Sequence, residues 1–299
     1  MNNHIIRCVA LALVVFALAA CGDDLQPTQP QDPKSTPMTF VVDYPGQTRA
    51  TATDFERNDR IGLYIADAKE PLELAGNLVN NEALTFDGNK WEAGRTLYWD
   101  EGTYNAYAYY PYMQDVTSVT DQPFSVSTDQ STQKTATALG GYLGGYEASD
   151  LLFATTKDVK ASDSPVRLTF RHIMSKLKIR LIKGEDFEGD MPTTAKVYIH
   201  NTVPTATIDL QAGVATRYVK GTRQTIVAHQ DGDTSYSAII VPQRIDNRQP
   251  LVEVEMMGVS YLFESKFLFK PGTEHLVNLV ISENPDKVKI NIGGEKQNW

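Results

Sequence analysis

The most regular feature of the chain is an alternation of apolar and polar residues with a period of two. In KLKIRL (176–181) and in KVKINIG (287–293) every second residue is apolar. Successive side chains of a strand point to opposite faces of its sheet, so these segments predict strands with one buried face. The other segments of this type are MTFVVDY (38–44), RIGLYIA (60–66), YNAYAYYPY (104–112), VRLTF (166–170), KVYIH (196–200), ATIDL (206–210), SAIIVP (237–242), VEVEM (252–256), FLFK (267–270) and HLVNLVIS (275–282).

Turn residues separate these segments and complete a β pattern. They include Pro45-Gly46, Asp87-Gly88-Asn89, Asp231-Gly232-Asp233 and Pro271-Gly272. Many short alternating strands between regularly spaced turns are typical of antiparallel β-sandwiches. Helical periodicity is weak everywhere, and 70–84 has room for one short helix at most. We therefore expect an all-β fold of antiparallel sandwiches.

The tyrosine-rich strand 104–112 has two distinct faces. Alternation places Tyr104, Ala106, Ala108 and Tyr110 on one face and Tyr107 and Tyr109 on the other. Aromatic side chains suit strands because they pack well on a pleated surface, so packing within the sheet is the favoured interpretation. A platform for carbohydrate is the alternative.

A change of phase marks a boundary near the middle of the chain. Val166, Leu168 and Phe170 occupy even positions, whereas the apolar residues of 176–181 are odd. A shift by one residue moves every side chain to the opposite face, so one continuous strand cannot contain both sets. A bulge or turn is expected within 172–176, which suggests two domains of similar size, at 38–172 and 173–299.

The N-terminus has the pattern of an exported protein. Val9 to Ala20 is a continuous apolar run, too short to span a bilayer, that ends in small residues. This pattern is typical of a secretory signal peptide, here residues 1–20. Leu18-Ala19-Ala20-Cys21 resembles a bacterial lipobox, so Cys21 is the expected lipidation site, with acyl chains such as palmitate as a stable membrane anchor.

A flexible tether is predicted between the signal peptide and the first strand. Residues 21–37 are rich in Pro, Gln, Asp and Thr and cannot bury a core. The pair Asp23-Asp24 resembles a signal that sends lipoproteins to the bacterial cell surface. A solvated linker explains the two aspartates equally well.

Charge and cysteine content narrow the class of protein. The sequence has 28 basic and 37 acidic residues. Cleavage before Cys21 removes Arg7 and no acid, leaving 27 basic against 37 acidic residues, a net charge of −10. A strongly acidic chain is a poor ligand for nucleic acid or for anionic lipid. Cys8 is lost with the signal peptide and Cys21 is acylated, so no disulfide is expected and stability depends on core burial.

The sequence contains no recognisable catalytic or metal-binding motif. HExxH, GxSxG and paired cysteines are absent, and DGDTS (231–235) lacks the later ligands of a calcium loop, so it is interpreted as a hairpin turn. His172 continues the apolar face of its strand and is interpreted as a structural residue of the core. We expect no cofactor, no metal and no enzymatic activity.

Five segments in order resemble one family. They are TRATATDFERNDRIGLYIAD (48–67), YNAYAYYPY (104–112), DLLFATTKDV (150–159), VRLTFRHIMSKLKI (166–179) and FKPGTEHLVNLVIS (269–282). Together, behind a lipobox, they resemble the fimbrillin-like (Mfa-like) lipoproteins of Bacteroidales. The resemblance implies two tandem transthyretin-like β-sandwich domains and a role as a subunit, anchor or tip of a type V pilus. It implies no enzyme.

The same resemblance implies a mechanism of assembly. In polymerising members an arginine-specific protease cuts near the first strand, which would here fall between Arg49 and Ala50. Loss of that strand opens a groove for a donor strand from another pilin subunit. The corresponding donor would be the last strand, with Val288, Ile290 and Ile292 on one face. The alternative for Arg49 is an ordinary arginine in a turn, and the alternative for the last strand is an ordinary core strand of the second domain.

The resemblance also implies a location and partners. The protein would be lipid-anchored in the outer membrane and exposed at the cell surface, or part of a fimbrium if it polymerises. Its partners would be other pilin subunits and a ligand on a host or bacterial surface.

Two rival functions come from other classes of protein. One is a monomeric surface lipoprotein that binds glycans through the aromatic residues Trp91, Trp99, Tyr107 or Tyr109. The other is a secreted hydrolase, for which the sequence offers neither a triad nor a metal set. Polymerisation separates the first rival from a pilin.

Overall fold

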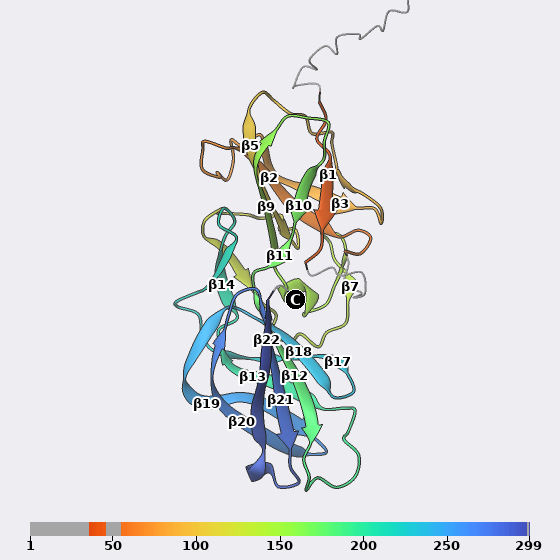
Figure 1. Cartoon of the computed structure of the whole chain (residues 1–299), viewed down its shortest axis with the longest axis vertical. Coiled ribbons are helices and arrows are strands. Elements are labelled where there is room, and N and C mark those ends of the chain that lie inside the picture. Colours follow the sequence, from red (N-terminus) through yellow and green to blue (C-terminus); the bar gives the residue numbers. More distant parts are fainter. Residues whose placement is uncertain (1–35, 46–54, 298) are drawn as a thin grey trace, which may run out of the picture. The chain divides into compact units, whose positions relative to one another are not determined.

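The computed structural model describes residues 36–45, 55–297 and 299, and within them the chain is built almost wholly from β-strands (Figure 1). The helical pieces among these residues are two single 3-10 turns, η2 (Glu147–Ser149) and η3 (Pro285–Lys287). No helix in this part of the chain is long and apolar enough to cross a membrane. The short helix allowed for 70–84 is not formed, because the end of that segment pairs with a strand as the start of β3. The predicted all-β class is confirmed.

The first large sheet has six strands and is antiparallel throughout. Its order is β11-β9-β5-β2-β3-β4. The bounds are β2 (Arg60–Asp67), β3 (Val79–Phe86), β4 (Trp91–Ala93), β5 (Thr103–Tyr110), β9 (Leu152–Lys160) and β11 (Arg171–His172). A separate pair, β1 (Phe40–Asp43) and β10 (Val166–Thr169), packs on one face of this sheet (Figure 1).

Two further sheets contain most of the second half of the chain. The five-stranded sheet has the order β17-β18-β12-β21-β22, and the four-stranded sheet has the order β16-β13-β19-β20. The bounds are β12 (Ser175–Lys183), β13 (Lys196–Thr202), β16 (Gln224–Val227), β17 (His229–Gly232), β18 (Ser235–Ile240), β19 (Gln243–Met256), β20 (Val259–Phe269), β21 (Thr273–Ile281) and β22 (Lys289–Gln297). As predicted for DGDTS, a turn joins β17 to β18 in a hairpin.

The smaller sheets connect distant parts of the sequence. β6 (Gln122–Ser125) pairs with β14 (Thr205–Asp209), which also pairs with β15 (Val214–Arg217). β7 (Thr135–Ala136) and β8 (Tyr142–Leu143) form a short hairpin within the long loop 127–147. The Gln130 side chain from this loop bonds the backbone of Ile239 in β18 at both its N–H and its carbonyl, so its contacts are not confined to the first half.

The predicted break in phase within 172–176 corresponds to a change of sheet. β11 ends at His172 in the six-stranded sheet, and β12 begins at Ser175 in the five-stranded sheet. Ile173 and Met174 lie between them and are both buried. The switch reverses which positions face inward, as the change from even to odd positions requires. A division into domains at 172/173 remains a prediction.

Two hydrophobic clusters form the core. The first core is enclosed between the six-stranded sheet and the β1–β10 pair, and its members all lie between Met38 and Phe170. The second core lies between the five- and four-stranded sheets and extends to the other face of the six-stranded sheet. Within β5, Ala106 and Ala108 belong to the first core and Tyr107 and Tyr109 to the second, as the alternation predicted.

The sheets are not purely antiparallel, which corrects the sequence-based expectation. β1 runs parallel to β10, and β12 runs parallel to β21 over nine residue pairs, from Ser175–Thr273 to Lys183–Ile281. Parallel neighbours need a long connection, and here more than 80 residues separate β12 from β21. Local alternation carries no information about the direction of so distant a partner.

Candidate functional site

Two strands carry the residues that the sequence singled out for assembly, and each is described here from its contacts. β1 precedes the segment that contains Arg49 and Ala50. β22 contains two of the predicted donor residues, Ile290 and Ile292, and Val288 lies just before it. Arg49, Ala50 and Cys21 themselves lie outside the described residues. Tyr44 and Phe55, which flank the segment with Arg49, approach each other edge to face, with their ring centroids 5.0 Å apart.

β1 is held between two parts of the first half of the chain. On one side it pairs with β10, from Phe40–Val166 to Asp43–Thr169. On the other side the residues just before it bond the segment that follows β4: the N–H of Met38 donates to the carbonyl of Leu97 at 2.8 Å. β1 therefore fills a slot between two backbone edges, with no third strand over it among the described residues.

The inward side chains of β1 close the first core. Met38 is buried, and Phe40, Val42 and Tyr44 pack partly buried against the same cluster. Beneath them lie large apolar side chains that are at most 8% exposed: Trp91, Leu97, Trp99, Val166, Leu168 and Phe170. A strand that covers so many apolar groups contributes strongly to stability, because each buried large side chain is worth about 1.5–3 kcal/mol.

An ion pair fixes the end of β1. The Asp43 carboxylate accepts hydrogen bonds from Nε and Nη2 of Arg167 at 2.6 and 2.9 Å, and from Oγ1 of Thr169 at 3.1 Å. The hydrogen bond from Arg167 is the largest influence holding the pKa of Asp43 below its ordinary value. Both partners are in β10, so this contact joins the two strands of the pair.

β22 lies at the edge of the five-stranded sheet and has one strand neighbour among the described residues, β21 (Figure 1). Val288 and Ile290 pack partly buried against the second core, whereas Ile292 is 64% exposed. Ile290 and Ile292 pair with Leu279 and Val277 of β21, so they share the inward face as the sequence predicted. The edge position leaves Ile292 largely uncovered.

His172 is a buried residue of the junction between the sheets. Its side chain is 2% exposed, and Nδ1 lies 2.8 Å from Oδ1 of Asp150. The burial inferred from the sequence is confirmed. Asp150 gave no signal of its own in the sequence, because the contact joins residues 22 positions apart in a loop and a strand.

The aromatic side chains that would serve a glycan-binding protein are buried, which confirms the favoured interpretation of packing and gives no support to the alternative of a carbohydrate platform. Tyr107 is 2% exposed, Tyr109 1%, Trp99 1% and Trp91 8%. The six-stranded sheet is covered on both faces, so neither face of β5 is available as a platform. The hydroxyls are also engaged: that of Tyr109 bonds Oδ1 of Asn81 at 2.5 Å, and that of Tyr107 accepts from Nζ of Lys157 at 2.6 Å.

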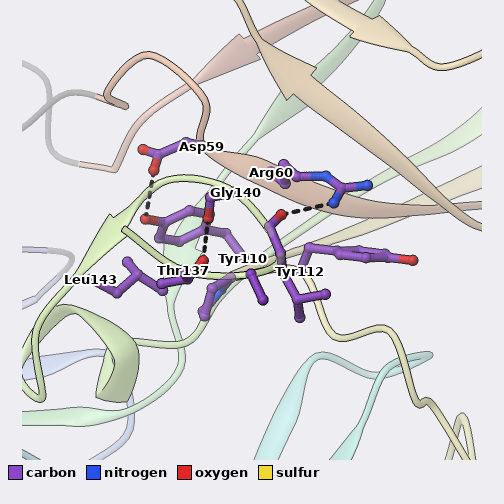
Figure 2. Close-up of a pocket in the computed structure, with 10 residues that line it drawn as sticks. Asp59, Arg60, Tyr110, Tyr112, Thr137, Gly140 and Leu143 are labelled. Carbon is purple, nitrogen blue, oxygen red and sulfur yellow. Dashed lines mark hydrogen bonds between the residues drawn. The ribbon is translucent and has the colours of Figure 1, made fainter. Parts of the chain in front are cut away.

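A cavity of about 150 Å³ lies beside β2 and the end of β5 (Figure 2). Figure 2 shows the Tyr110 hydroxyl directed at Asp59, to whose carboxylate it donates at 3.2 Å. Burial is the largest influence on this carboxyl and raises its pKa. Nη1 of Arg60 donates to the carbonyl of Leu139 at 2.8 Å, and the guanidinium lies over the ring of Tyr112.

The polar groups of this cavity are bonded mainly to its own walls. Nε of Arg60 is buried without a hydrogen-bond partner among the described residues. In the same part of the chain no group of three or more His, Cys, Asp and Glu side chains could hold a metal ion. The structure thus directs attention to β1 and β22 rather than to a chemical centre.

Comparison with known proteins identifies the family of this chain. The model of the family described as fimbrillin-like matches residues 48–299. The chain belongs to the fimbrillin-like family. The resemblance noted from the five sequence segments is thereby confirmed.

The individual relatives of this fimbrillin-like chain share less than a third of its residues over the aligned region. A candidate fimbrium tip subunit of Bacteroides ovatus, Fim1C, is 28% identical over 169 residues, which cover 46% of this chain and 31% of that protein. The chain thus matches about a third of the length of that relative.

Solved structures share the fold. A candidate cell adhesion protein from Bacteroides uniformis has a TM-score of 0.66 at 21% identity, covering 87% of this chain and 98% of that one. Another from B. ovatus has a TM-score of 0.64 at 19% identity, covering 88% and 97%. At these identities the likeness concerns the fold alone.

Proposed function

We propose that this fimbrillin-like protein is a surface-exposed subunit of a fimbrium or of its adhesive tip, and that it assembles by exchange of strands. In this proposal β1 leaves its slot after cleavage between Arg49 and Ala50, and a strand from another subunit takes its place. Val288 and the strand β22, with Ile290 and Ile292, form the segment that this subunit donates. Cys21 carries the lipid that anchors the precursor in the outer membrane.

The placement of β1 is the observation that supports this proposal most directly. The strand packs on the first core and pairs with β10 along one edge, and Met38 just before it is bonded to Leu97. Arg49 follows the strand within six residues. Its departure would leave unpaired edges beside apolar pockets, which is the surface that an added strand recognises. The two-domain organisation, 38–172 and 173–299, belongs to the same proposal, with the slot in one domain and the donor in the other.

The position of β22 supports its role as donor. Removing an edge strand breaks one ladder, whereas removing a central strand breaks two. Its apolar residues alternate with Lys289 and Asn291, so the free strand would stay soluble. The buried aromatic residues of β5 give no support to the rival glycan-binding function.

A pair of substitutions on neighbouring residues tests the proposal. Ile290→Asp places a charge where an apolar side chain would enter a dry groove, which costs several kcal/mol. Lys289→Asp changes the exposed face of the same strand. In cells that polymerise this protein, wild type and Lys289→Asp should give ladders on unboiled gels, and Ile290→Asp should give monomer.

Ile290 is partly buried in its own sheet, so the purified Ile290→Asp monomer must also show a cooperative thermal transition. Assembly of a folded Ile290→Asp variant at the wild-type level would reject the donor role of β22.

A further inference from the structure

The residue Trp299, beyond the end of β22, stacks on His172. The ring centroids are 4.0 Å apart with an interplanar angle of 18°. Nζ of Lys176 lies 5.9 Å from the centroid of the indole. Trp299 is partly buried and belongs to the apolar residues packed against the second core. The indole therefore docks at the point where the chain passes from β11 to β12.

His172 is also contacted from the direction of β1. The ring of Tyr44, the residue that follows β1, meets the imidazole edge to face at a centroid distance of 6.2 Å and an angle of 81°. The bond to Asp150 fixes the imidazole, and both Tyr44 and Asp150 line a cavity of about 160 Å³. Loss of Tyr44 would open this cavity and admit water to the contact between Asp150 and His172. One buried ring thus joins the ends of the two strands that the proposed function sets in motion.

Apart from its backbone pairing with β21, β22 has few side-chain contacts beyond Ile290. Every residue from Asn291 to Lys296 is exposed, and the register slips between Leu276 and Val277 of β21. The polar contacts of this stretch centre on Glu295, which pairs with Nζ of Lys270 at 2.6 Å and lies 3.4 Å from Nδ1 of His275. A segment with few buried apolar contacts opens locally more often than the core around it. The stack of Trp299 therefore adds to the backbone pairing with β21 in holding this end of β22 in place.

We propose that Trp299 and His172 form a clasp that retains β22 in its own sheet, and that the clasp is weakened when Tyr44 leaves with β1. This inference rests on the proposed function, because it concerns the order of its two strand movements. The intact chain keeps β22 seated, and loss of β1 releases the Trp299 end of the donor. The edge of β21 then becomes uncovered only in a chain whose β1 slot is already vacant, so premature pairing between unprocessed copies is disfavoured.

Hydrogen exchange of the full-length monomer tests the clasp without any polymerisation. A stacked aromatic pair changes a local opening equilibrium by about three- to tenfold. Trp299→Ala should therefore accelerate exchange of the β22 amides by that factor, with β2 and β5 unchanged. Tyr44→Ala should also accelerate exchange in β22, although Tyr44 itself packs against the first core and is not part of β22.

The double variant is the decisive measurement. If both residues act through His172, Tyr44→Ala should add little to Trp299→Ala, whereas independent effects would multiply. Val41→Ala and Lys296→Ala are the matched controls. Val41, in β1, is 39% exposed, and Lys296 is an exposed residue of β22. In both control variants the β22 amides should exchange at the wild-type rate.

The inference would be overturned if the β22 amides of Tyr44→Ala exchanged at the wild-type rate. It would also be overturned if the acceleration in the double variant equalled the product of those in Tyr44→Ala and Trp299→Ala. Either result would leave donor-strand assembly untouched, since that stands or falls with the ladder of Ile290→Asp. Loss of assembly in Ile290→Asp together with coupled exchange would support both.

Discussion

The carboxylate of Asp43 accepts two hydrogen bonds from the guanidinium of Arg167, at 2.6 and 2.9 Å. The two residues are 124 positions apart in sequence. They lie in the two parallel strands β1 and β10, so the pair fastens the end of the strand that the proposed assembly removes. The contact is partly exposed, with 28% of the Asp43 side chain and 69% of the Arg167 side chain accessible to solvent.

The Asp43–Arg167 pair makes stability depend on pH in a defined direction. The pKa of Asp43 is lowered in the folded protein, so its contribution is fully present above the unfolded pKa and is lost as the pH falls through the folded value. Because the pair is exposed to solvent, we expect its contribution to stability to be small. Arg167→Met should lower the melting temperature at pH 7 and have little effect at pH 2.

Arg95→Met is a suitable control, because Arg95 forms a similarly exposed pair with Glu82 on the β3–β4 side of the sheet. Exchange of the β1 amides should rise in Arg167→Met and stay unchanged in Arg95→Met. Equal exchange of β1 in the two variants would show that the pair does not hold the strand.

A glycine in the β14–β15 turn provides a test of packing between the two halves of the chain. Gly213 has a φ of +64°, and a Cβ there would lie 2.1 Å from Cδ1 of Phe153 in β9. Gly213→Ala therefore combines backbone strain with overpacking, and should lower the free energy of unfolding by about 2–4 kcal/mol.

Gly258→Ala isolates the backbone part of this effect. Gly258 has a φ of +73° with nothing within 4 Å of the added Cβ, so only about 1 kcal/mol should be lost. Chemical denaturation of the two variants measures the difference. If Gly213→Ala were no more destabilising than Gly258→Ala, the close packing of the turn on Phe153 would be refuted.

Much of the fold follows from local alternation, and the reason is visible in β5. Ala106 and Ala108 face one core and Tyr107 and Tyr109 face the other, because side chains of a strand must alternate. The change of sheet after His172 was likewise predictable, since the shift from even to odd apolar positions cannot occur in one strand. What alternation leaves open is whether the second face is wet or buried.

The favoured packing of the aromatic residues within the sheet is confirmed, and this gap explains why a carbohydrate platform stayed open as the alternative. Tyr104 and Tyr107 could be assigned to opposite faces of their strand, but only the tertiary structure covers both faces. The parallel partners of β1 and β12 were equally invisible, because pairing over more than 80 residues is decided by packing. The contact of Trp299 with His172 belongs to the same class: two residues 127 positions apart with no shared local pattern.

Lipidation of Cys21 is a prediction that depends on the sequence alone. A multiply acylated cysteine gives stable anchoring, since each buried methylene contributes about 0.8 kcal/mol. Cys21→Ala should move the protein out of the membrane fraction and abolish incorporation of labelled palmitate, with the melting temperature of the folded part unchanged. Acyl label on the Cys21→Ala protein at the wild-type level would refute the assignment.

Cleavage after Arg49 should not by itself empty the β1 slot. Met38, Phe40, Val42 and Tyr44 stay packed on the first core, and the backbone bonds to β10 and Leu97 remain, so the cut strand is held as a non-covalent ligand. We expect that digestion of the folded protein with an arginine-specific protease leaves a fragment ending at Arg49 bound, detectable by native mass spectrometry.

Asp43→Ala should speed the loss of that fragment several-fold, because the grip of Arg167 is gone, whereas Val41→Ala, on the exposed face, should not. Arg49→Ala should block the cut and keep β1 covalently attached. A strand that buries four of its own apolar side chains dissociates slowly unless a competing strand displaces it. Spontaneous and complete loss of the fragment from the wild-type protein would therefore contradict this prediction.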